Sequence, residues 1–389
     1  MTVTQPELDR LRAAASHQVE AVAALATRIC ETPAPTGSEK RRAELVASLL
    51  AERGYHPEMD AVGNVYARRG SQPDLPVLML LAHTDTVFPA DTPINVERDG
   101  DILRGPGIGD NSTSVAAMVG LLGILDELQL QTAVDIVAVA NVGEEGLGNL
   151  RGARAAVERY CEHLGAVIVI DGRLGHITHG AVGSRRWRVT VQGPGGHSYG
   201  DFGKPSAIHG LGRIIAAIAE LEVPRDPKTT YNVGVIEGGT SVNTIAPMAA
   251  AIVDMRSTDV PALDRLTEQV RQVVERCAGE GLRPEIEVLG ERPAGTRDRS
   301  DPLVQLADEA ISWVGLEPQY QVSSTDANVP ISLGIPAVCV GVTIGEQAHT
   351  VHEFIHVPPI RDGLAQLLRL CLEASALVAR QASSDSRTP

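Results

Sequence analysis

Residues 76–85 read PVLMLLAHTD, an unbroken apolar run that ends in a histidine, a threonine and an aspartate. A short apolar run without alternation is typical of a strand that is buried on both faces of a sheet. The same pattern recurs at residues 133–140, 166–170 and 337–342, with helical stretches between the runs. Strands and helices that alternate in this way predict an α/β fold with a mostly parallel, doubly wound sheet.

Apolar residues at helical spacing predict helices before, between and after these strands. They are expected over residues 8–29, 38–53, 112–128, 151–162, 302–314 and 361–380. Thr36-Gly-Ser-Glu resembles an N-terminal capping signal for the second of these helices. A short hairpin is expected between that helix and residue 76.

Between residues 184 and 292 the pattern changes to strand, helix, strand, strand, helix, strand. This order is typical of a ferredoxin-like (β-α-β-β-α-β) domain. Because parallel-sheet elements resume at Pro293, we expect this domain to be inserted into one formed by residues 1–183 and 293–389. The expected elements are strand 186–192, helix 206–220, strands 230–237 and 249–256, helix 261–278 and strand 285–289.

The chain has 34 Lys and Arg against 49 Asp and Glu in 389 residues, a formal net charge of −15, and only 3% aromatic residues. This composition argues against nucleic acid and anionic membranes as partners, because both require basic surfaces. The start of the chain lacks a signal-peptide pattern, and the apolar runs stay far below the ~18 residues of a membrane span, so we expect a cytoplasmic protein. The five cysteines form no C-x-x-C motif, which predicts neither disulfides nor a thiolate metal site.

Ionisable side chains follow the apolar runs, where a doubly wound sheet binds its ligands. They are His83, Asp85, Asp110 in the segment RGPGIGDNS, Glu144, Glu145, Asp171 and His349. Carboxylates that gather at one edge repel one another unless cations neutralise them. Imidazole and carboxylate groups without thiolates suit two divalent metal ions, with zinc expected and cobalt or manganese as alternatives.

The chain resembles metallopeptidase family twenty, the dinuclear zinc exopeptidases and deacylases, from Glu31 to the HTVHEFI segment. The resemblance rests on the order and approximate spacing of His83-x-Asp85, Asp110, Glu144-Glu145, Asp171 and His349-x-x-His352-Glu353. Many members of the family have Asp-Met-Lys-Gly where this chain has Asp110 followed by Asn-Ser-Thr. With this departure and the segments EEGLGNLRGAR and SSTDAN, the chain most resembles the peptidase T-like branch of the family.

The resemblance implies a ligand set shared between two ions through Asp110, with His83 and Asp171 at the first ion and Glu145 and His349 at the second. Glu144 would be the general base, which takes a proton from the attacking water and passes it to the departing amine. Asp85 would hold the ring of His83.

The segment HTVHEFIH offers three histidines as the last ligand, His349, His352 and His356. Strand-favouring residues and the following Val-Pro-Pro argue against a helix that would align all three. The family pattern selects His349 and leaves the other two as structural or supporting residues.

The resemblance also makes the inserted domain a lid and a dimerisation domain. In the family, a histidine at the position of His197 stabilises the oxyanion of the tetrahedral intermediate, often from the partner subunit of a homodimer. Arg256 and Asn243 match positions that bind the substrate carboxylate or the reacting carbonyl. Asp326, in the loop 323–328, either meets a substrate ammonium or caps a turn.

These residues predict a dinuclear zinc hydrolase that cleaves the amide bond of small peptides, such as di- and tripeptides, next to a free terminus. An N-acyl amino acid amidohydrolase with the same mechanism is the alternative, and a metal-bound binding protein without activity is a distant one. A nucleotide-binding oxidoreductase is disfavoured, because the segment GPGIGDNS does not join a strand to a helix with G-x-G-x-x-G spacing.

Overall fold

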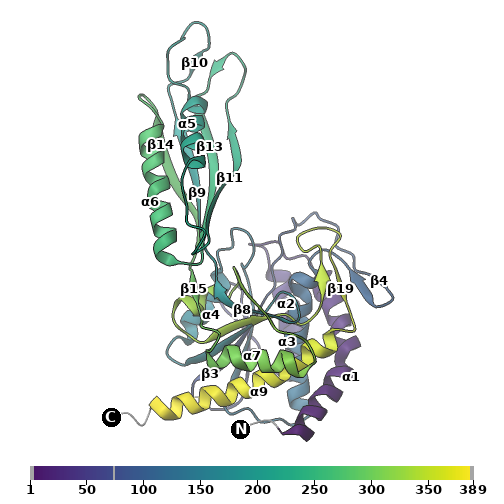
Figure 1. Cartoon of the computed structure of the whole chain (residues 1–389). Helices are drawn as coiled ribbons and strands as arrows, with labels where there is room; N and C mark the ends of the chain where they lie inside the picture. Colours follow the sequence, from purple (N-terminus) through teal and green to yellow (C-terminus); the bar gives the residue numbers. More distant parts are fainter. Residues whose placement is uncertain (1–3, 73–74, 386–389) are drawn as a thin grey trace. The chain divides into compact units, whose positions relative to one another are not determined.

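The computed structural model describes residues 4–72 and 75–385. Contacts between Cα atoms divide the chain into two compact units (Figure 1). Unit 1 comprises Met1–Ala181 and Thr296–Pro389, and unit 2 comprises Val182–Gly295. The boundaries expected from the sequence, after residues 183 and 292, lie close to these.

The large mixed sheet lies in unit 1, and β15 enters it from the last residue of unit 2. Its strands are β1 (Glu58–Met59), β2 (Val65–Arg69), β3 (Val77–His83), β6 (Ile136–Asn141), β7 (Leu164–Ile170), β8 (His176–Ala181), β15 (Gly295–Thr296), β16 (Gln319–Ser323) and β17 (Ala337–Val340). The strand order is β1-β2-β6-β3-β7-β17-β8-β15, and β16 pairs with β8. The central strands β6, β3, β7 and β17 are parallel. The predicted parallel sheet is therefore confirmed at the centre, whereas β2 and β8 join it antiparallel.

Helices cover both faces of this sheet, because its central strands are apolar on both sides. Leu78 and Leu80 of β3 enter one hydrophobic core, and Met79 and Leu81 enter another. The first core includes residues of α1 (Gln5–Cys30), α2 (Lys40–Ala51), α3 (Ser114–Glu127), α7 (Pro302–Trp313) and α9 (Ile360–Asp385). The second includes residues of α4 (Arg151–Tyr160) and α8 (Asn328–Ser332). The doubly wound arrangement is confirmed.

One stretch among the described residues, Ile108–Glu127, is long and apolar enough to cross a membrane by length and composition. It combines a π-helical turn (Ile108–Thr113) with α3. Of its most apolar 18-residue segment, 83% is buried inside the structure. Its side chains contribute to the first core, between α1 and α9. Its apolar composition is accounted for by this burial.

A small antiparallel sheet, which the sequence analysis did not anticipate, joins two distant parts of unit 1. Its order is β18-β19-β5-β4, with β4 at Glu97–Asp99, β5 at Ile102–Arg104, β18 at Gly345–Glu346 and β19 at Phe354–His356. The pairing of β19 with β5 brings the loop that carries His349 beside the glycine-rich segment that carries Asp110.

Unit 2 has the predicted β-α-β-β-α-β order, formed by β9 (Gly183–Gln192), α5 (Ala207–Ala219), β11 (Thr229–Gly238), β13 (Met248–Ser257), α6 (Val260–Cys277) and β14 (Arg283–Arg292). Its antiparallel sheet has the order β11-β13-β9-β14, which confirms the ferredoxin-like fold (Figure 1). Trp187, Val189 and Val191 alternate with polar residues along β9 and pack against α5 and α6. Its function as a lid or a dimerisation domain stays a prediction.

Candidate metal centre and active site

The cluster lies at the edge of the sheet where the central parallel strands end. His83 is the last residue of β3, and its partner in the register is Asn141, the last residue of β6. Asp171 follows β7 directly, and Glu144 and Glu145 follow β6 by a short turn. The parallel register therefore brings residues from three strand ends to one edge.

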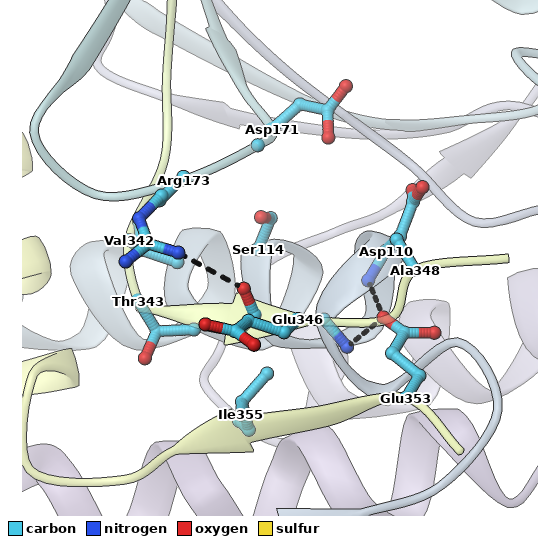
Figure 2. Close-up of a pocket in the computed structure, with 13 residues that line it drawn as sticks. Asp110, Ser114, Asp171, Arg173, Val342, Thr343, Glu346, Ala348, Glu353 and Ile355 are labelled. Carbon is cyan, nitrogen blue, oxygen red and sulfur yellow. Dashed lines mark hydrogen bonds between the residues drawn. The ribbon is translucent and has the colours of Figure 1, made fainter. Parts of the chain in front are cut away.

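Asp110 lies in a glycine-rich turn that a buried carboxylate holds in place. Glu353 is only 2% exposed, and one of its oxygens accepts the backbone N–H groups of Gly109 at 2.8 Å and Asp110 at 2.7 Å (Figure 2). The other oxygen accepts the N–H of Gly107 at 2.6 Å. Gly107 has a φ of 81°, a left-handed conformation that favours glycine. The three donors fix the backbone from which the side chain of Asp110 projects.

Asp110 lies between two histidines. Its Oδ1 is 3.1 Å from Nε2 of His83, and its Oδ2 is 3.0 Å from Nε2 of His349. The same nitrogen of His349 lies 3.0 Å from Oε1 of Glu145. Two groups of potential ligands result, with donor atoms within 4.8 Å of one another: His83, Asp110 and Asp171, and Asp110, Glu145 and His349. The five expected metal ligands thus form two triads that share Asp110.

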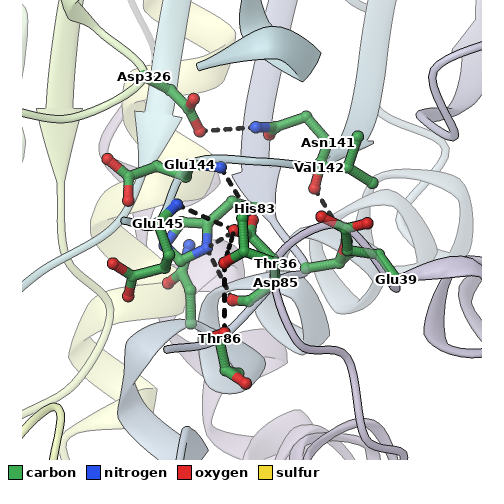
Figure 3. A network of polar contacts seen from close by, with 12 residues as sticks. Thr36, Glu39, His83, Asp85, Thr86, Asn141, Val142, Glu144, Glu145 and Asp326 are labelled. Carbon is green, nitrogen blue, oxygen red and sulfur yellow. Dashed lines mark hydrogen bonds and ion pairs between the residues drawn. The ribbon is translucent and has the colours of Figure 1, made fainter. Parts of the chain in front are cut away.

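Glu144 belongs to the same cluster. Together with His83 and Glu145 it forms a third group of donors within 4.8 Å, and its side chain is buried (Figure 3). Among the residues of these three groups, Glu144 is the carboxylate that lies outside the two triads that share Asp110. That geometry suits a general base beside a metal centre.

Burial and the close approach of charged groups shift the pKa values of several side chains in the cluster. Hydrogen bonds to Asp110 and Glu145 raise the pKa of His349 to about 10. Burial lowers the pKa of His83, but its contacts with the carboxylates of Asp110 and Asp85 outweigh burial and raise the pKa well above the ordinary value. Burial and the charge of Asp110 raise the pKa of Asp171 to about 7. A site that favours positive charge this strongly fits cations.

Asp85 is fully buried and organises the backbone of Glu144 and Glu145. Its two oxygens accept the N–H groups of Glu144 and Glu145, each at 2.9 Å (Figure 3). The expectation that its carboxylate holds the ring of His83 needs refinement. Nδ1 of His83 lies 3.6 Å from that carboxylate but 3.1 Å from the backbone oxygen of Asp85. Burial opposes ionisation of Asp85, yet the contact with His83 and the two amides lower its pKa to about 2.

The capping role predicted for Thr36 is wrong. Helix α2 begins after Glu39, and no side chain caps it with a hydrogen bond. The Thr36 hydroxyl instead donates to Oδ2 of Asp85 at 2.9 Å. A buried carboxylate needs hydrogen-bond donors more than a partly exposed helix end does, because water cannot replace them.

Asp326 lies behind the cluster rather than at a surface. It is fully buried, and its Oδ2 accepts the side-chain N–H of Asn141 at 2.7 Å (Figure 3). Its charge also raises the pKa of Asp171, though less than burial and Asp110 do. This position fits support of β6 through Asn141 better than direct contact with a substrate ammonium.

His352 and His356 lie outside the two triads and the third group. His352 is exposed, and the ring of His356 makes an edge contact with Phe354 at 5.7 Å between centroids. His349 itself has a φ of 64° in the loop between β18 and β19. These positions agree with a strand, not a helix, after residue 353.

In unit 2, the structure brings His197 and Asn243 together. His197 is the second residue of β10 (Gly196–His197), which pairs with β12 (Thr244–Ile245), and the N–H of Ser198 donates to the backbone oxygen of Asn243 at 2.9 Å. Nδ1 of His197 accepts the N–H groups of the next two turn residues at 3.3 and 3.2 Å. In the neutral ring the proton therefore resides on Nε2, which is free to act as a donor.

The segment around His197 also has the G-x-S-x-G spacing of serine hydrolases, with Ser198 at its centre. In those enzymes the serine lies on a sharp turn between a strand and a helix. Here Ser198 follows the short strand β10 and enters an exposed turn instead. The fold therefore does not support a serine nucleophile.

Arg256 lies near the end of β13, whereas the paired strands β10 and β12 adjoin the beginning of β13. Its Nε donates to Oδ2 of Asp254 at 2.7 Å, and Asp254 also pairs with Arg186 at 3.2 Å. Its side chain is 42% exposed. The guanidinium expected to bind a substrate carboxylate thus already contacts a carboxylate of its own strand.

Glu353 is the residue whose part the sequence analysis missed. It appeared only as the last position of the His349 motif, with no role. Its contacts with residues 107–110 depend on the pairing of β5 with β19, which local sequence does not reveal.

A cluster of imidazoles and carboxylates at the carboxyl edge of a doubly wound sheet, in a chain with a ferredoxin-like insertion, defines a metallohydrolase. The family model described as Peptidase family M20/M25/M40 matches residues 79–373. The chain belongs to this family and is a hydrolase that acts on amide bonds. The resemblance inferred from the motifs is confirmed.

Known proteins similar to this chain include both peptidases and a deacylase. A succinyl-diaminopimelate desuccinylase of Methylobacterium sp. (strain 4-46) is 28% identical over 383 residues, 90% of this chain and 95% of the relative. The solved structure of aminopeptidase PepT from Bacillus cereus has a TM-score of 0.75 at 22% identity, and the match covers 92% of this chain and 99% of the PepT chain. A Staphylococcus aureus tripeptidase has a TM-score of 0.77 at 23% identity, and the match covers 93% of this chain and 99% of the tripeptidase chain.

Proposed function

We propose that the protein is a two-metal exopeptidase that cleaves the amide bond of di- and tripeptides. The observation that carries the proposal is the position of Asp110, whose Oδ1 lies 3.1 Å from His83 and whose Oδ2 lies 3.0 Å from His349. A carboxylate placed in this way suits a bridge between two ions. His83 and Asp171 complete one site, and Glu145 and His349 complete the other.

The donor set supports zinc as the metal. Two imidazoles and three carboxylates fit zinc, and also cobalt or manganese, whereas no thiolate belongs to either triad. When bound, two such ions polarise a carbonyl and lower the pKa of a coordinated water. The raised pKa values of His83 and His349 support this assignment, because contacts with carboxylates cause both of them. Burial raises the pKa of Asp171, and the charge of Asp110 adds to that effect.

The protein's own residues supply the proton transfers and the substrate contacts. Glu144 takes a proton from the attacking water and delivers it to the amine that leaves. His197, with its proton on Nε2, donates to the developing oxyanion. Asn243 lies beside His197 in unit 2 and supplies a second polar contact to the reacting carbonyl. Arg256 contacts a substrate carboxylate through its remaining N–H groups.

The comparisons support two substrate classes. The solved relatives named as an aminopeptidase and a tripeptidase favour small peptides, and the desuccinylase favours an N-acyl amino acid as the alternative. Both reactions are hydrolysis of an amide by the same residues. Turnover of di- and tripeptides, N-acetyl amino acids and N-succinyl amino acids by the zinc- and cobalt-loaded protein separates them. Absence of turnover for every substrate would contradict the proposal.

A homodimer through unit 2 is part of the proposal. Exposed apolar side chains adjoin His197 and Asn243, namely Tyr199 at 89%, Phe202 at 91% and Val242 at 101% exposure. Exposed apolar groups gathered in this way mark protein contacts. His197 would then act in the partner subunit, and sedimentation velocity measures the dimer directly. A cytoplasmic location stays a prediction.

A further inference from the structure

A cavity of about 190 Å³ lies within unit 1 beside the metal cluster (Figure 2). Asp110 and Asp171 form part of its wall, and the segment around β18 forms another part. Arg173 and Glu346 bring two further charges to the same cavity. A group bound in the cavity would therefore lie next to the expected metal ligands and within a wall that includes a cationic side chain.

The backbone of Arg173 is fixed, whereas its guanidinium has few partners. Arg173 forms a parallel bridge with Thr343, and the N–H of Leu174 donates to the Thr343 oxygen at 2.8 Å. Nη1 donates to the backbone oxygen of Gly345 at 3.4 Å, which is a long hydrogen bond (Figure 2). Within residues 4–72 and 75–385, Arg173 forms no ion pair with a carboxylate. Four of the five guanidinium N–H donors are thus available to an anion.

Arg173 differs in this respect from Arg256. The guanidinium of Arg256 already donates to Asp254 at 2.7 Å, so it must give up part of that contact to bind another carboxylate. Arg173 has no such competitor, and it follows the expected metal ligand Asp171 by two residues. Because a planar guanidinium can donate two parallel hydrogen bonds, it is well suited to a carboxylate.

We propose that this cavity is a carboxylate-binding subsite, in which Arg173 recognises a free carboxylate of the substrate. The inference rests on the proposed function and adds the chemical class of the group next to the amide that is cleaved. The carboxylate has two possible sources, the C-terminus of a short peptide or the acyl group of an N-succinyl amino acid. Glu346, in the β18 part of the wall, opposes a second negative charge and limits the cavity to one carboxylate.

A purely structural role for Arg173 predicts a different pattern. In that case Arg173 would hold the two cavity segments together through its contacts with Thr343 and Gly345, and its loss would impair all substrates equally. A carboxylate subsite predicts opposite effects of the two substitutions. Arg173→Ala weakens binding of carboxylate substrates, whereas Glu346→Gln strengthens it, because the like charge is removed.

The test uses the metal-loaded full chain and substrates in matched pairs. One pair is a dipeptide with a free C-terminus and its C-terminal amide, and the other is an N-succinyl and an N-butanoyl amino acid amide. We expect Arg173→Ala to raise KM about tenfold or more for the carboxylate member of one pair, with a change below twofold for its neutral partner. The pair that responds identifies the source of the carboxylate.

Two further variants serve as controls. Arg173→Lys keeps the charge without the fork and should give an intermediate KM. Arg361→Ala removes an exposed arginine that pairs with Asp362 and should match the unsubstituted protein. Equal losses for both members of each pair, or a KM for Arg173→Ala equal to that of the unsubstituted protein, would overturn the subsite.

Binding measurements keep the inference separate from the proposed function. The same pairs are titrated calorimetrically into metal-loaded Glu144→Gln protein, in which turnover is not needed. A preference for the carboxylate member that Arg173→Ala abolishes supports the subsite, even where the proposed peptidase activity fails. A preference that survives Arg173→Ala contradicts it, even where the activity is confirmed.

Discussion

The candidate residues of unit 1 and those of unit 2 are held in different ways. In unit 1, Asp85 and Glu353 are buried carboxylates that receive backbone amides from the segments bearing Glu144, Glu145 and Asp110. In unit 2, His197 is exposed and accepts only amides of its own turn.

This difference indicates that the candidate residues of the two units have different functions. The group of candidate metal ligands is preorganised within one unit, because these side chains project from strand ends and a turn that buried hydrogen bonds fix. The candidate residues of unit 2 are polar groups without such buried support, and the role proposed for them requires substrate or a partner subunit to reach them. Substitutions in unit 1 should therefore change chemistry or metal affinity, and those in unit 2 should leave the metal in place.

The largest effect is expected for Glu144→Gln. Glutamine keeps the size of the side chain but cannot accept the proton, so kcat should fall by about 10²- to 10⁴-fold. Metal content by elemental analysis should remain unchanged, because Glu144 lies outside the two triads that share Asp110. Glu44→Gln, an exposed residue on α2, is the matched control. Loss of metal together with activity would instead make Glu144 a ligand.

His197→Ala should reduce kcat by about 10²- to 10³-fold, the usual cost of one oxyanion donor, with unchanged metal content. If His197 acts from the partner subunit, mixing His197→Ala with Glu144→Ala protein should restore part of the activity, since one heterodimer site is intact. Steady-state kinetics of the mixture measure this. A mixture no more active than its components would count against action between subunits.

Glu353→Gln should weaken metal binding by about 10- to 100-fold, as substitutions behind a ligand do. Glutamine presents one acceptor oxygen to a turn that supplies three amide donors, so Asp110 loses its support. Excess zinc should restore kcat without a change in KM, and metal titration should show the weakened site. Inactivity that excess metal fails to relieve, in a protein with normal circular dichroism, would argue against a positioning role.

Arg256→Ala should have the smallest effect. Its guanidinium is shared with Asp254, so KM should rise by less than about tenfold for carboxylate substrates, and kcat should not change. Thermal unfolding checks that the exposed pair contributes little to stability. A rise in KM of a hundredfold would mean that Arg256 leaves Asp254 and becomes the main anion contact.

The sequence predicted the centre of the fold better than its edges. The apolar run at 76–82 marked β3 because both of its faces are buried, and the strand ends then located the cluster. Strands β8 and β18 were not expected, because short, polar stretches such as HITHGA show no clear alternation of apolar and polar residues. Glu353 and Arg173 were also missed, since their surroundings come from segments far apart in the chain that only tertiary pairing brings together.

The most direct test of the metal centre is its stoichiometry. The zinc-loaded protein, dialysed and measured by elemental analysis, should hold about two ions per chain. Asp110→Asn, which weakens the shared ligand while preserving its size, should fall below one. Fewer than one ion per chain in the unsubstituted protein, or two ions retained by Asp110→Asn, would contradict a centre built around Asp110.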